Sequence, residues 1–244
     1  MDLNNLKLQL PILFEDEHYI AINKPAGVLV HRTSMAKEEN ELLAVQMLRN
    51  QIGQKVNPLH RIDRPTSGVL LFGKSSEATS LLQPLFTTHQ VKKYYLSLVR
   101  GYMGESHGLI DHPLKKKLIG ALQEAKTEYW SLAQSEIPFS SSPRYESSRY
   151  SLIKAYPHSG RMHQIRRHMA HERHYIIGDT AHGDNKQNNF FRKQFGLQHM
   201  LLHAWKLEFH HPISQVEIKI HAGLPDYFLE MLTLVQLNSI EIDT

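Results

Sequence analysis

One short stretch concentrates charged side chains that could carry out chemistry. Residues 60–68 read HRIDRPTSG and place Asp63 between Arg61 and Arg64. An ionised carboxylate can act as a nucleophile or a base, and neighbouring cations favour its charged form. An aspartate close to a proline is more often a turn-capping residue with solvated neighbours. The surrounding sequence therefore has to decide between a catalytic and a structural interpretation of Asp63.

A lysine and tyrosine stretch follows, in which residues 91–96 read VKKYYL. These residues lead into a predicted strand, where successive side chains point to opposite faces. Lys93 and Tyr95 share one face and are available to a substrate. Tyr94 points to the opposite face, which we expect to be core.

A third stretch, residues 160–166, reads GRMHQIR and begins a predicted helix. Arg166 follows Ile165 at the edge of an apolar helical stripe, where a guanidinium is costly unless a carboxylate meets it. The two residues that come next on this helix, Arg167 and His168, are interpreted as part of its solvated face.

The composition excludes several classes of chemistry. None of the 244 residues is a cysteine, which excludes a disulfide framework, a thiolate metal site and a cysteine nucleophile. The 17 histidines include four between residues 199 and 211, but they lack metal-ligand spacing, so we expect no metal. No apolar run approaches the ~18 residues that a membrane span needs. We therefore expect a cytoplasmic protein without membrane contact, and the net charge of +4 is compatible with RNA as a partner.

Hydrophobic periodicity predicts the elements that position these residues. Runs rich in β-branched and aromatic residues predict strands at residues 19–23, 69–72, 94–100, 127–132, 149–156, 201–209 and 216–221. Helical spacing predicts helices over residues 41–51, 75–89 and 161–171 and a fourth after Pro225, with a kink at Pro84. Residues 136–148 and 184–198 are polar and predict surface loops. This order predicts an α+β fold, with a large mixed, mainly antiparallel sheet flanked by helices.

Taken together, the motifs resemble those of the RluA-type pseudouridine synthases. HRIDRPTSG is similar to the family signature H-R-L-D-x-x-T-S-G, with Ile62 in place of leucine. NKPAGVLVH at residues 23–31, the K-x-Y pattern at residues 93–95 and GRMHQIR are similar to the other family motifs. The resemblance covers about residues 13–222. It implies a single pseudouridine-synthase-type domain over residues 1–244 with an RNA-binding cleft, without a separate N-terminal RNA-binding domain.

The resemblance also implies an activity, the isomerisation of uridine to pseudouridine in RNA without a cofactor. Asp63 would be the nucleophile, whether it attacks C1′, adds to C6 or removes a sugar proton. Tyr95 would stack on the extruded uracil and handle its C5 proton, while Arg166 would pair with Asp63. Arg61 would fill the place that the flipped-out base vacates.

The remaining candidate substrate-binding residues are Lys93, Ile165 and His60. The first motif is expected to be mainly structural, with Lys24 near the site. Lysines 115–117 are either phosphate contacts or plain solvated surface.

Details of the motifs resemble most the tRNA pseudouridine synthase C branch of the family. These details are LVHR at residues 29–32, Arg64 and Pro65 directly after the nucleophile, and GDTAHGDNKQN at residues 178–188. The resemblance implies a monomer that needs no protein partner and acts on tRNA near the T-stem boundary, at a site of the position 65 type. Three alternatives stay open: large-subunit rRNA as the substrate, a noncatalytic RNA-binding module, and an aspartate-nucleophile hydrolase of small molecules.

Overall fold

The computed structural model describes residues 9–31, 42–116, 120–141 and 143–237. Arg32 and the predicted helix start at residue 41 lie outside these ranges. The first part of the chain forms β1 (Ile12–Glu15), β2 (Tyr19–Lys24), α1 (Ala44–Ile52), β3 (Asn57–Pro58), β4 (Ser67–Gly73), α2 (Ser76–Thr87) and β5 (Lys92–Arg100). The middle forms β6 (His107–Asp111), β7 (Leu114–Lys115), β8 (Leu122–Gln123), β9 (Lys126–Ile137) and β10 (Ser148–Pro157). The last part forms α3 (Gln164–His171), α4 (Asn185–Phe195), β11 (Leu202–His210), β12 (Glu217–His221) and α5 (Asp226–Leu234).

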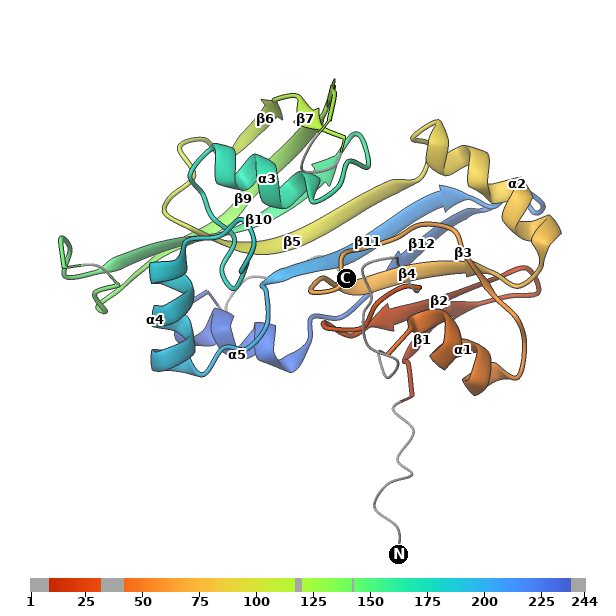
Figure 1. Ribbon diagram of the computed structural model, residues 1–244, viewed down its shortest axis with the longest axis horizontal. Coiled ribbons are helices and arrows are strands. Elements are labelled where there is room, and N and C mark those ends of the chain that lie inside the picture. The colour runs from red at the N-terminus through yellow and green to blue at the C-terminus, as the bar shows by residue number, and fades with distance from the viewer. Residues whose placement is uncertain (1–8, 32–41, 117–119, 142, 238–244) are drawn as a thin grey trace, which may run out of the picture.

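Ten strands form one large sheet, which is the main body of a single domain (Figure 1). Its strand order is β1-β2-β4-β11-β5-β10-β9-β6, with β12 beside β11 and β3 beside β4. β4 and β11 are parallel, and the other paired strands within the described ranges are antiparallel. The predicted α+β class and the mixed, mainly antiparallel sheet are thus confirmed.

The parallel contact brings together two segments that are far apart in the sequence. Ser67 lies opposite His203, and Gly68 lies opposite Ala204. Gly68 has a φ of 111°, and a Cβ added there would overlap the carbonyl oxygen of Ala204. Glycine is therefore required at this position of the HRIDRPTSG motif, because it alone allows both the backbone conformation and the close approach.

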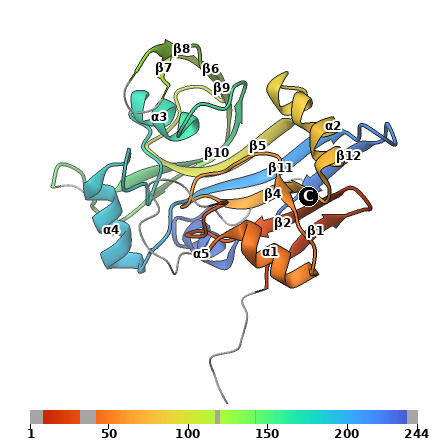
Figure 2. The ribbon, with the colours of Figure 1, turned by 45° about the vertical axis from the view of Figure 1, so that its right-hand side comes forward.

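Helices cover both faces of the sheet. In the N-terminal part, α1 packs against Leu70 of β4, and α2 packs against its neighbour Leu71. Adjacent strand residues point to opposite faces, so these two helices lie on opposite sides of the sheet. The same alternation places α3 over Ile153 of β10 and α5 under Leu152. Helices α2 and α3 lie above the sheet in Figure 1, and Figure 2 shows the two layers from another side.

The segment predicted as a second polar loop is instead largely α4. Asp184 caps its first turn by accepting a hydrogen bond from Lys186 N, and Gly196 ends it in the left-handed conformation. Phe191 is fully buried, and Phe190 and Phe195 pack around it. The exposed face of this helix is so polar that its narrow aromatic stripe did not stand out from the sequence.

Most other element boundaries are close to those predicted, but β9 continues to Ile137, beyond the predicted end at residue 132. α1 begins at Ala44, and α2 continues through Pro84 as far as Thr87. The predicted loop after residue 136 is confirmed, since β9 ends at Ile137 and the next strand begins at Ser148. Strands β1, β3, β6, β7 and β8 are short and were not predicted from the sequence. Within the described ranges, no helix has the length and apolar character needed to cross a lipid bilayer.

Candidate active site

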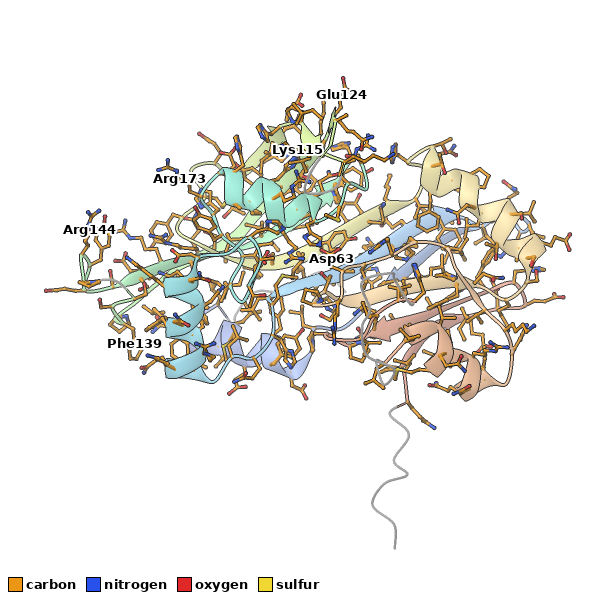
Figure 3. All side chains as sticks on the ribbon, in the orientation of Figure 1. Asp63, Lys115, Glu124, Phe139, Arg144 and Arg173 are labelled. Carbon is orange, nitrogen blue, oxygen red and sulfur yellow. The ribbon has the colours of Figure 1, made fainter. Side chains whose placement is uncertain are left out.

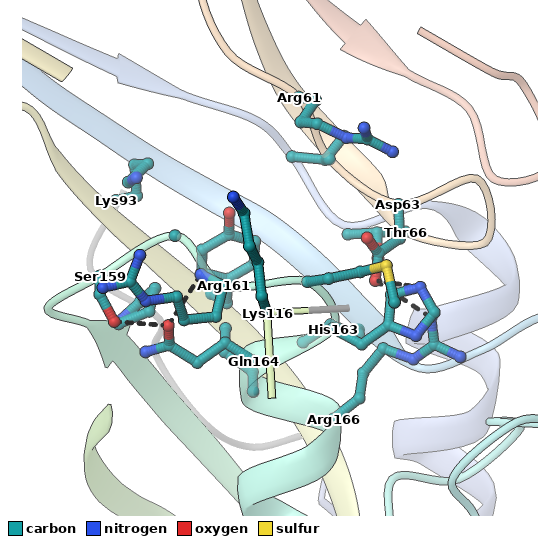
Figure 4. A pocket seen from close by; sticks show the side chains of 17 residues that line it. Arg61, Asp63, Thr66, Lys93, Lys116, Ser159, Arg161, His163, Gln164 and Arg166 are labelled. Carbon is teal, nitrogen blue, oxygen red and sulfur yellow. Dashed lines mark hydrogen bonds and ion pairs between the residues drawn. The ribbon is translucent and has the colours of Figure 1, made fainter. Parts of the chain in front are cut away.

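A cavity of about 310 Å³ lies between the loop that precedes β4 and the N-terminal end of α3 (Figure 4). Asp63 lies near the middle of the molecule, at the junction of these two elements (Figure 3). The structure brings six of the seven predicted site residues together in the lining of this cavity. They are Arg61, Asp63, Lys93, Tyr95, Ile165 and Arg166.

The loop that carries Asp63 is fixed by the NKPAG motif. Arg64 O accepts a hydrogen bond from Gly27 N at 2.8 Å, and Arg64 Nε donates to Gly27 O at 3.0 Å. Lys24 is fully buried, and its ammonium donates to the carbonyl oxygens of Pro25, Val28 and Arg64. Burial lowers the pKa of Lys24 to about 7, although the charge of Asp63 acts in the opposite direction. The first motif thus has a structural role next to the site.

Arg166 bridges two carboxylates from different parts of the chain. Its Nη1 donates to Oδ2 of Asp63 at 3.0 Å, the contact that was predicted. Its Nε and Nη2 donate to the two carboxylate oxygens of Asp179 at 2.8 and 2.7 Å. Arg166 is 4% exposed and Asp179 is 1% exposed, so this forked pair is almost completely removed from water. Two-pronged contacts of this kind fix the orientation of a guanidinium as well as its charge.

The charge states of this bridge follow from the balance of burial and pairing. Burial opposes the charge of Asp179, but the hydrogen bonds and charge of Arg166 outweigh it, so the pKa of Asp179 is lowered. Burial likewise opposes the charge of Arg166, and the contacts with Asp179 and Asp63 outweigh it and raise the Arg166 pKa. Both groups are therefore ionised at neutral pH, and Arg166 presents a fixed positive charge to Asp63.

The two tyrosines of the VKKYYL motif lie in different environments. Tyr95 lines the cavity, and burial, followed by the charge of Asp63, raises its pKa well above the usual range. Tyr94 lies on the other face of the strand, as predicted, but it is not buried in the core. Its ring is partly exposed, with its centre 5.2 Å from the centre of the Tyr156 ring. Lys154 and Lys206 lie about 6 Å from the centre of the Tyr94 ring. These neighbours belong to strands β10 and β11, and they leave the Tyr94 ring partly exposed.

Cations surround the mouth of the cavity. In Figure 4, Lys93 and Arg161 lie on the side of the cavity away from Asp63. The side chain of Lys116 lies between these two residues and Asp63. Burial lowers the pKa of Lys93. Arg161 is partly fixed by a hydrogen bond from its Nε to Glu124 O at 3.1 Å. An anionic ligand would meet positive charge here before it reaches Asp63.

His60 is the predicted site residue that the structure places away from the cavity. Its Nε2 accepts a hydrogen bond from Leu71 N at 3.1 Å, and its ring stacks on Phe86 of α2 at 5.1 Å. Burial, followed by the charge of Lys93, lowers the His60 pKa to about 3. A neutral ring that accepts a backbone hydrogen bond is part of the packing between the sheet and α2.

Several residues around α3 were missed or misinterpreted. His163 lines the cavity from the position before the helix, with a left-handed φ of 54°. This conformation is the reason that α3 begins at Gln164 and not at residue 161. Gln164 accepts a hydrogen bond from Arg161 N and donates to Lys126 O, so it ties the helix start to β9. Both residues belong to the GRMHQIR motif, and this position is the signal that could have identified them from the sequence.

His168 was predicted to lie on the solvated face of the helix, and this prediction is wrong. It is fully buried, with Nδ1 beside Thr127 Oγ1 at 2.8 Å and Nε2 beside His112 O at 2.9 Å. Asp179 lies in the GDTAHGDNKQN stretch, but the sequence does not predict its contact with Arg166, because that contact depends on the chain returning after α3. Within the described ranges, no three His, Asp or Glu side chains are grouped so that they could hold a metal ion.

Comparisons with known proteins give matches over most of the chain. Residues 18–171 match the family model described as RNA pseudouridylate synthase. A tRNA pseudouridine synthase C of Vibrio parahaemolyticus is 44% identical over 236 residues, which cover 93% of this chain and 95% of the relative. A tRNA pseudouridine synthase C of Pasteurella multocida is 47% identical over 246 residues, which cover 96% of this chain and 100% of the relative.

Solved structures share the fold. The structure of Human RNA Pseudouridylate Synthase Domain Containing 1 matches with a TM-score of 0.71 at 19% identity, and the match covers 99% of this chain and 100% of that one. Human RNA Pseudouridylate Synthase Domain Containing 4 also gives a TM-score of 0.71, at 23% identity and with 93% of each chain covered. With the family model and the relatives above, these findings show that the chain belongs to the RNA pseudouridylate synthase family, whose members are isomerases that convert uridine in RNA to pseudouridine.

Proposed function

We propose that this chain isomerises uridine to pseudouridine in tRNA, near the T-stem boundary, with Asp63 as the nucleophile and without a cofactor. The observation that carries the catalytic part is the buried Arg166, which is fixed by Asp179 and donates to Asp63 at the wall of the cavity. Two relatives that are 44% and 47% identical over nearly their whole length are named tRNA pseudouridine synthase C, which supports tRNA as the substrate.

The chemistry needs an ionised carboxylate beside the nucleotide. Pseudouridine formation breaks the N1–C1′ bond, turns the uracil while it is bound, and joins C5 to C1′ without net oxidation or reduction. Attack at C1′, addition to C6 and removal of a sugar proton all require the anionic form of Asp63. Arg166 meets this carboxylate with an opposite charge, at 3.0 Å from Nη1 to Oδ2. It also holds the carboxylate in one orientation, which lowers the cost of reaching the reacting atom.

Tyr95 is suited to contact the base as a neutral phenol. The raised pKa of its hydroxyl means that the phenolate is strongly disfavoured near Asp63. We therefore propose that the ring stacks on the uracil and that the C5 proton leaves through water bound at the hydroxyl, and not to a phenolate base. Ile165, which is 6% exposed, would supply apolar contact from the α3 side.

The size of the cavity favours a nucleotide that has left the RNA helix. A volume of about 310 Å³ is at the small end of ligand sites, so it fits one nucleoside better than a stacked duplex. Flipping a base out of a helix costs a few kcal/mol, which contacts with the remaining RNA have to offset. Arg61 is exposed at the rim and is placed to enter the vacated position. Lys93, Lys116 and Arg161 would contact the phosphates around the flipped nucleotide.

The substrate is tested with unmodified RNA. Purified protein is incubated separately with a tRNA pool and with large-subunit rRNA, and pseudouridines are mapped at single-nucleotide resolution in each. We expect one new pseudouridine near the T-stem boundary of tRNA and none with an Asp63→Asn variant. Modification of rRNA alone would assign the other substrate. Retention of RNA binding without any pseudouridine would indicate a noncatalytic module.

A further inference from the structure

The two oxygens of the Asp63 carboxylate have different surroundings. Arg166 Nη1 donates to Oδ2 at 3.0 Å, and Nε2 of His163 lies 3.9 Å from the same oxygen. Within the described part of the chain, no side chain forms a hydrogen bond with Oδ1. The carboxylate is therefore held from one side, and Oδ1 is the oxygen left for a substrate.

His163 is held beside this carboxylate by its backbone. It occupies the position before α3 with a φ of 54°, which is uncommon for residues other than glycine. Strained backbone of this kind persists where the surrounding structure enforces it, and it is frequent at functional sites. Here the ring lines the cavity next to Asp63 and Arg166, as Figure 4 shows.

The other nitrogen of the ring meets a second histidine. Nδ1 of His163 lies 2.8 Å from Nε2 of His182, so one of the two nitrogens carries the hydrogen and the other accepts it. His182 belongs to the turn that Asp179 stabilises, since Asp179 Oδ1 accepts hydrogen bonds from Ala181 N and His182 N. The same turn thus supports both Arg166, through Asp179, and His163, through His182.

The chemistry of the contacts fixes the direction of this hydrogen bond. Burial is the main cause that lowers the pKa values of His163 and His182, so both rings are neutral at neutral pH. If Nδ1 of His163 carried the hydrogen, the lone pair of its Nε2 would face the carboxylate of Asp63. If His182 donates instead, His163 carries its hydrogen on Nε2, and an N–H group faces the carboxylate. The second arrangement is favourable, because an ionised carboxylate can only accept.

We propose that His163 is a positioning residue for the isomerisation: its Nε2 hydrogen, set by His182, holds Oδ2 of Asp63 together with Arg166 and leaves Oδ1 to react. This inference rests on the function proposed above. A separation of 3.9 Å is too long for a hydrogen bond. We expect the binding of RNA to shorten it, because contacts at catalytic groups are often long without substrate and tighten when substrate is bound.

Protonation of the histidine pair opposes this role. The charged groups that face His163 are Asp63 from the loop, Arg166 and Arg167 from α3, and Asp179 from the turn, and His182 is its titratable partner. An added proton would turn His163 into a cation that pairs with Asp63 and withdraws its negative charge from the substrate. Because the pKa of His163 is lowered, this loss of rate should begin below the usual histidine range.

Two substitutions of His163 distinguish the contribution of Nε2 from that of Nδ1. His163→Asn keeps a polar group near Nδ1 and removes the one that faces Asp63, whereas His163→Gln places an amide donor near Nε2. We expect the single-turnover rate at saturating protein to fall by about 100-fold in His163→Asn. We expect His163→Gln to recover at least about 10-fold of that loss, with the dissociation constant for tRNA changed by less than about 3-fold in both. His210→Asn, on an exposed histidine at the end of β11, is the matched control and should react like the wild type.

The hydrogen position is read directly by ¹⁵N NMR of the histidine rings in the RNA-free wild-type protein. We expect the resonance of His163 to report the Nε2–H tautomer, and His182→Leu to allow a mixture of tautomers. An Nδ1–H tautomer in the wild type overturns the proposal, and so do equal rates for His163→Asn and His163→Gln. Weaker tRNA binding at an unchanged saturating rate would make His163 an RNA contact instead. The NMR result does not depend on turnover, so failure of the proposed function, seen as an inactive wild type, remains distinguishable.

Discussion

Removing Arg166 should affect stability and catalysis through different partners. Arg166→Met leaves Asp179, which is 1% exposed, as a buried carboxylate without its counter-charge. Breaking a buried ion pair in this way costs about 3–5 kcal/mol of the free energy of unfolding. The same change removes the donor that orients Asp63, and loss of one such fixed donor lowers a reaction rate by about 10²- to 10³-fold. We expect both effects in the single variant.

A second substitution separates them. In Arg166→Met combined with Asp179→Asn, the buried charge disappears, and the asparagine oxygen can still accept the backbone hydrogen bonds of Ala181 and His182. We expect the double variant to regain about 2 kcal/mol or more of stability relative to Arg166→Met. Its rate should stay low, because Asp63 still lacks its donor.

Chemical denaturation measures the stabilities, and single-turnover pseudouridine formation at saturating protein measures the rates. Arg167→Met is the control, since this partly exposed neighbour donates to the carbonyl oxygens of Lys115 and Met162 and contacts no carboxylate in the described structure. It should cost less than about 1 kcal/mol. An Arg166→Met variant as stable as the wild type would refute the buried pair. A double variant that regains the wild-type rate would refute the action of Arg166 on Asp63.

Three further changes test other parts of the structure. Tyr95→Phe should keep RNA binding but lower the single-turnover rate, because the stacking ring stays and the hydroxyl is lost, whereas Tyr94→Phe should react like the wild type; the opposite ranking would exchange their roles. The buried His203 has its pKa lowered from 6.5 to about 4 by burial, so the unfolded chain binds the proton more tightly and stability falls as the pH drops from about 6.5 to 4. At pH 5 the loss in the free energy of unfolding is about 2 kcal/mol. If the stability of His203→Gln, measured by denaturation, falls with pH as steeply as that of the wild type, this histidine is excluded as the cause. Gly68→Ala should destabilise the protein by at least about 2 kcal/mol in the same assay. Gly104→Ala should have little effect, because an added Cβ there meets nothing within 4 Å. Equal denaturation midpoints for the two variants would contradict the close approach of Gly68 to β11.

Residues whose role depends on short-range pattern could be placed from the sequence. Strand alternation put Lys93 and Tyr95 on the face that lines the cavity, and helical spacing put Arg166 beside buried residues. Both inferences use the geometry of one element only. The contact between Arg166 and Asp63 joins two elements, and the family motifs, not the periodicity, were needed to predict it.

Features that depend on long-range folding could not be placed in this way. Asp179 reaches Arg166 only because the chain turns back after α3, and His60 is buried only because Phe86 of α2 folds over it. α4 was missed because its exposed face is strongly polar and its aromatic stripe becomes meaningful only against α5. Tyr94 shows the reverse error, since alternation gave its face correctly but did not indicate that its neighbours there, Lys154 and Tyr156, leave the ring partly exposed.

In the proposed reaction, the carboxylate of Asp63 carries out the isomerisation. Asp63→Asn keeps the size and shape of the side chain and removes the anionic oxygen, so folding and tRNA binding should be retained. The direct test is a single-turnover assay with protein in excess over unmodified tRNA, with binding measured separately on the same samples. We predict binding within about 3-fold of the wild type and no detectable pseudouridine. Pseudouridine formed by Asp63→Asn at a rate comparable to that of the wild type would contradict this role of Asp63.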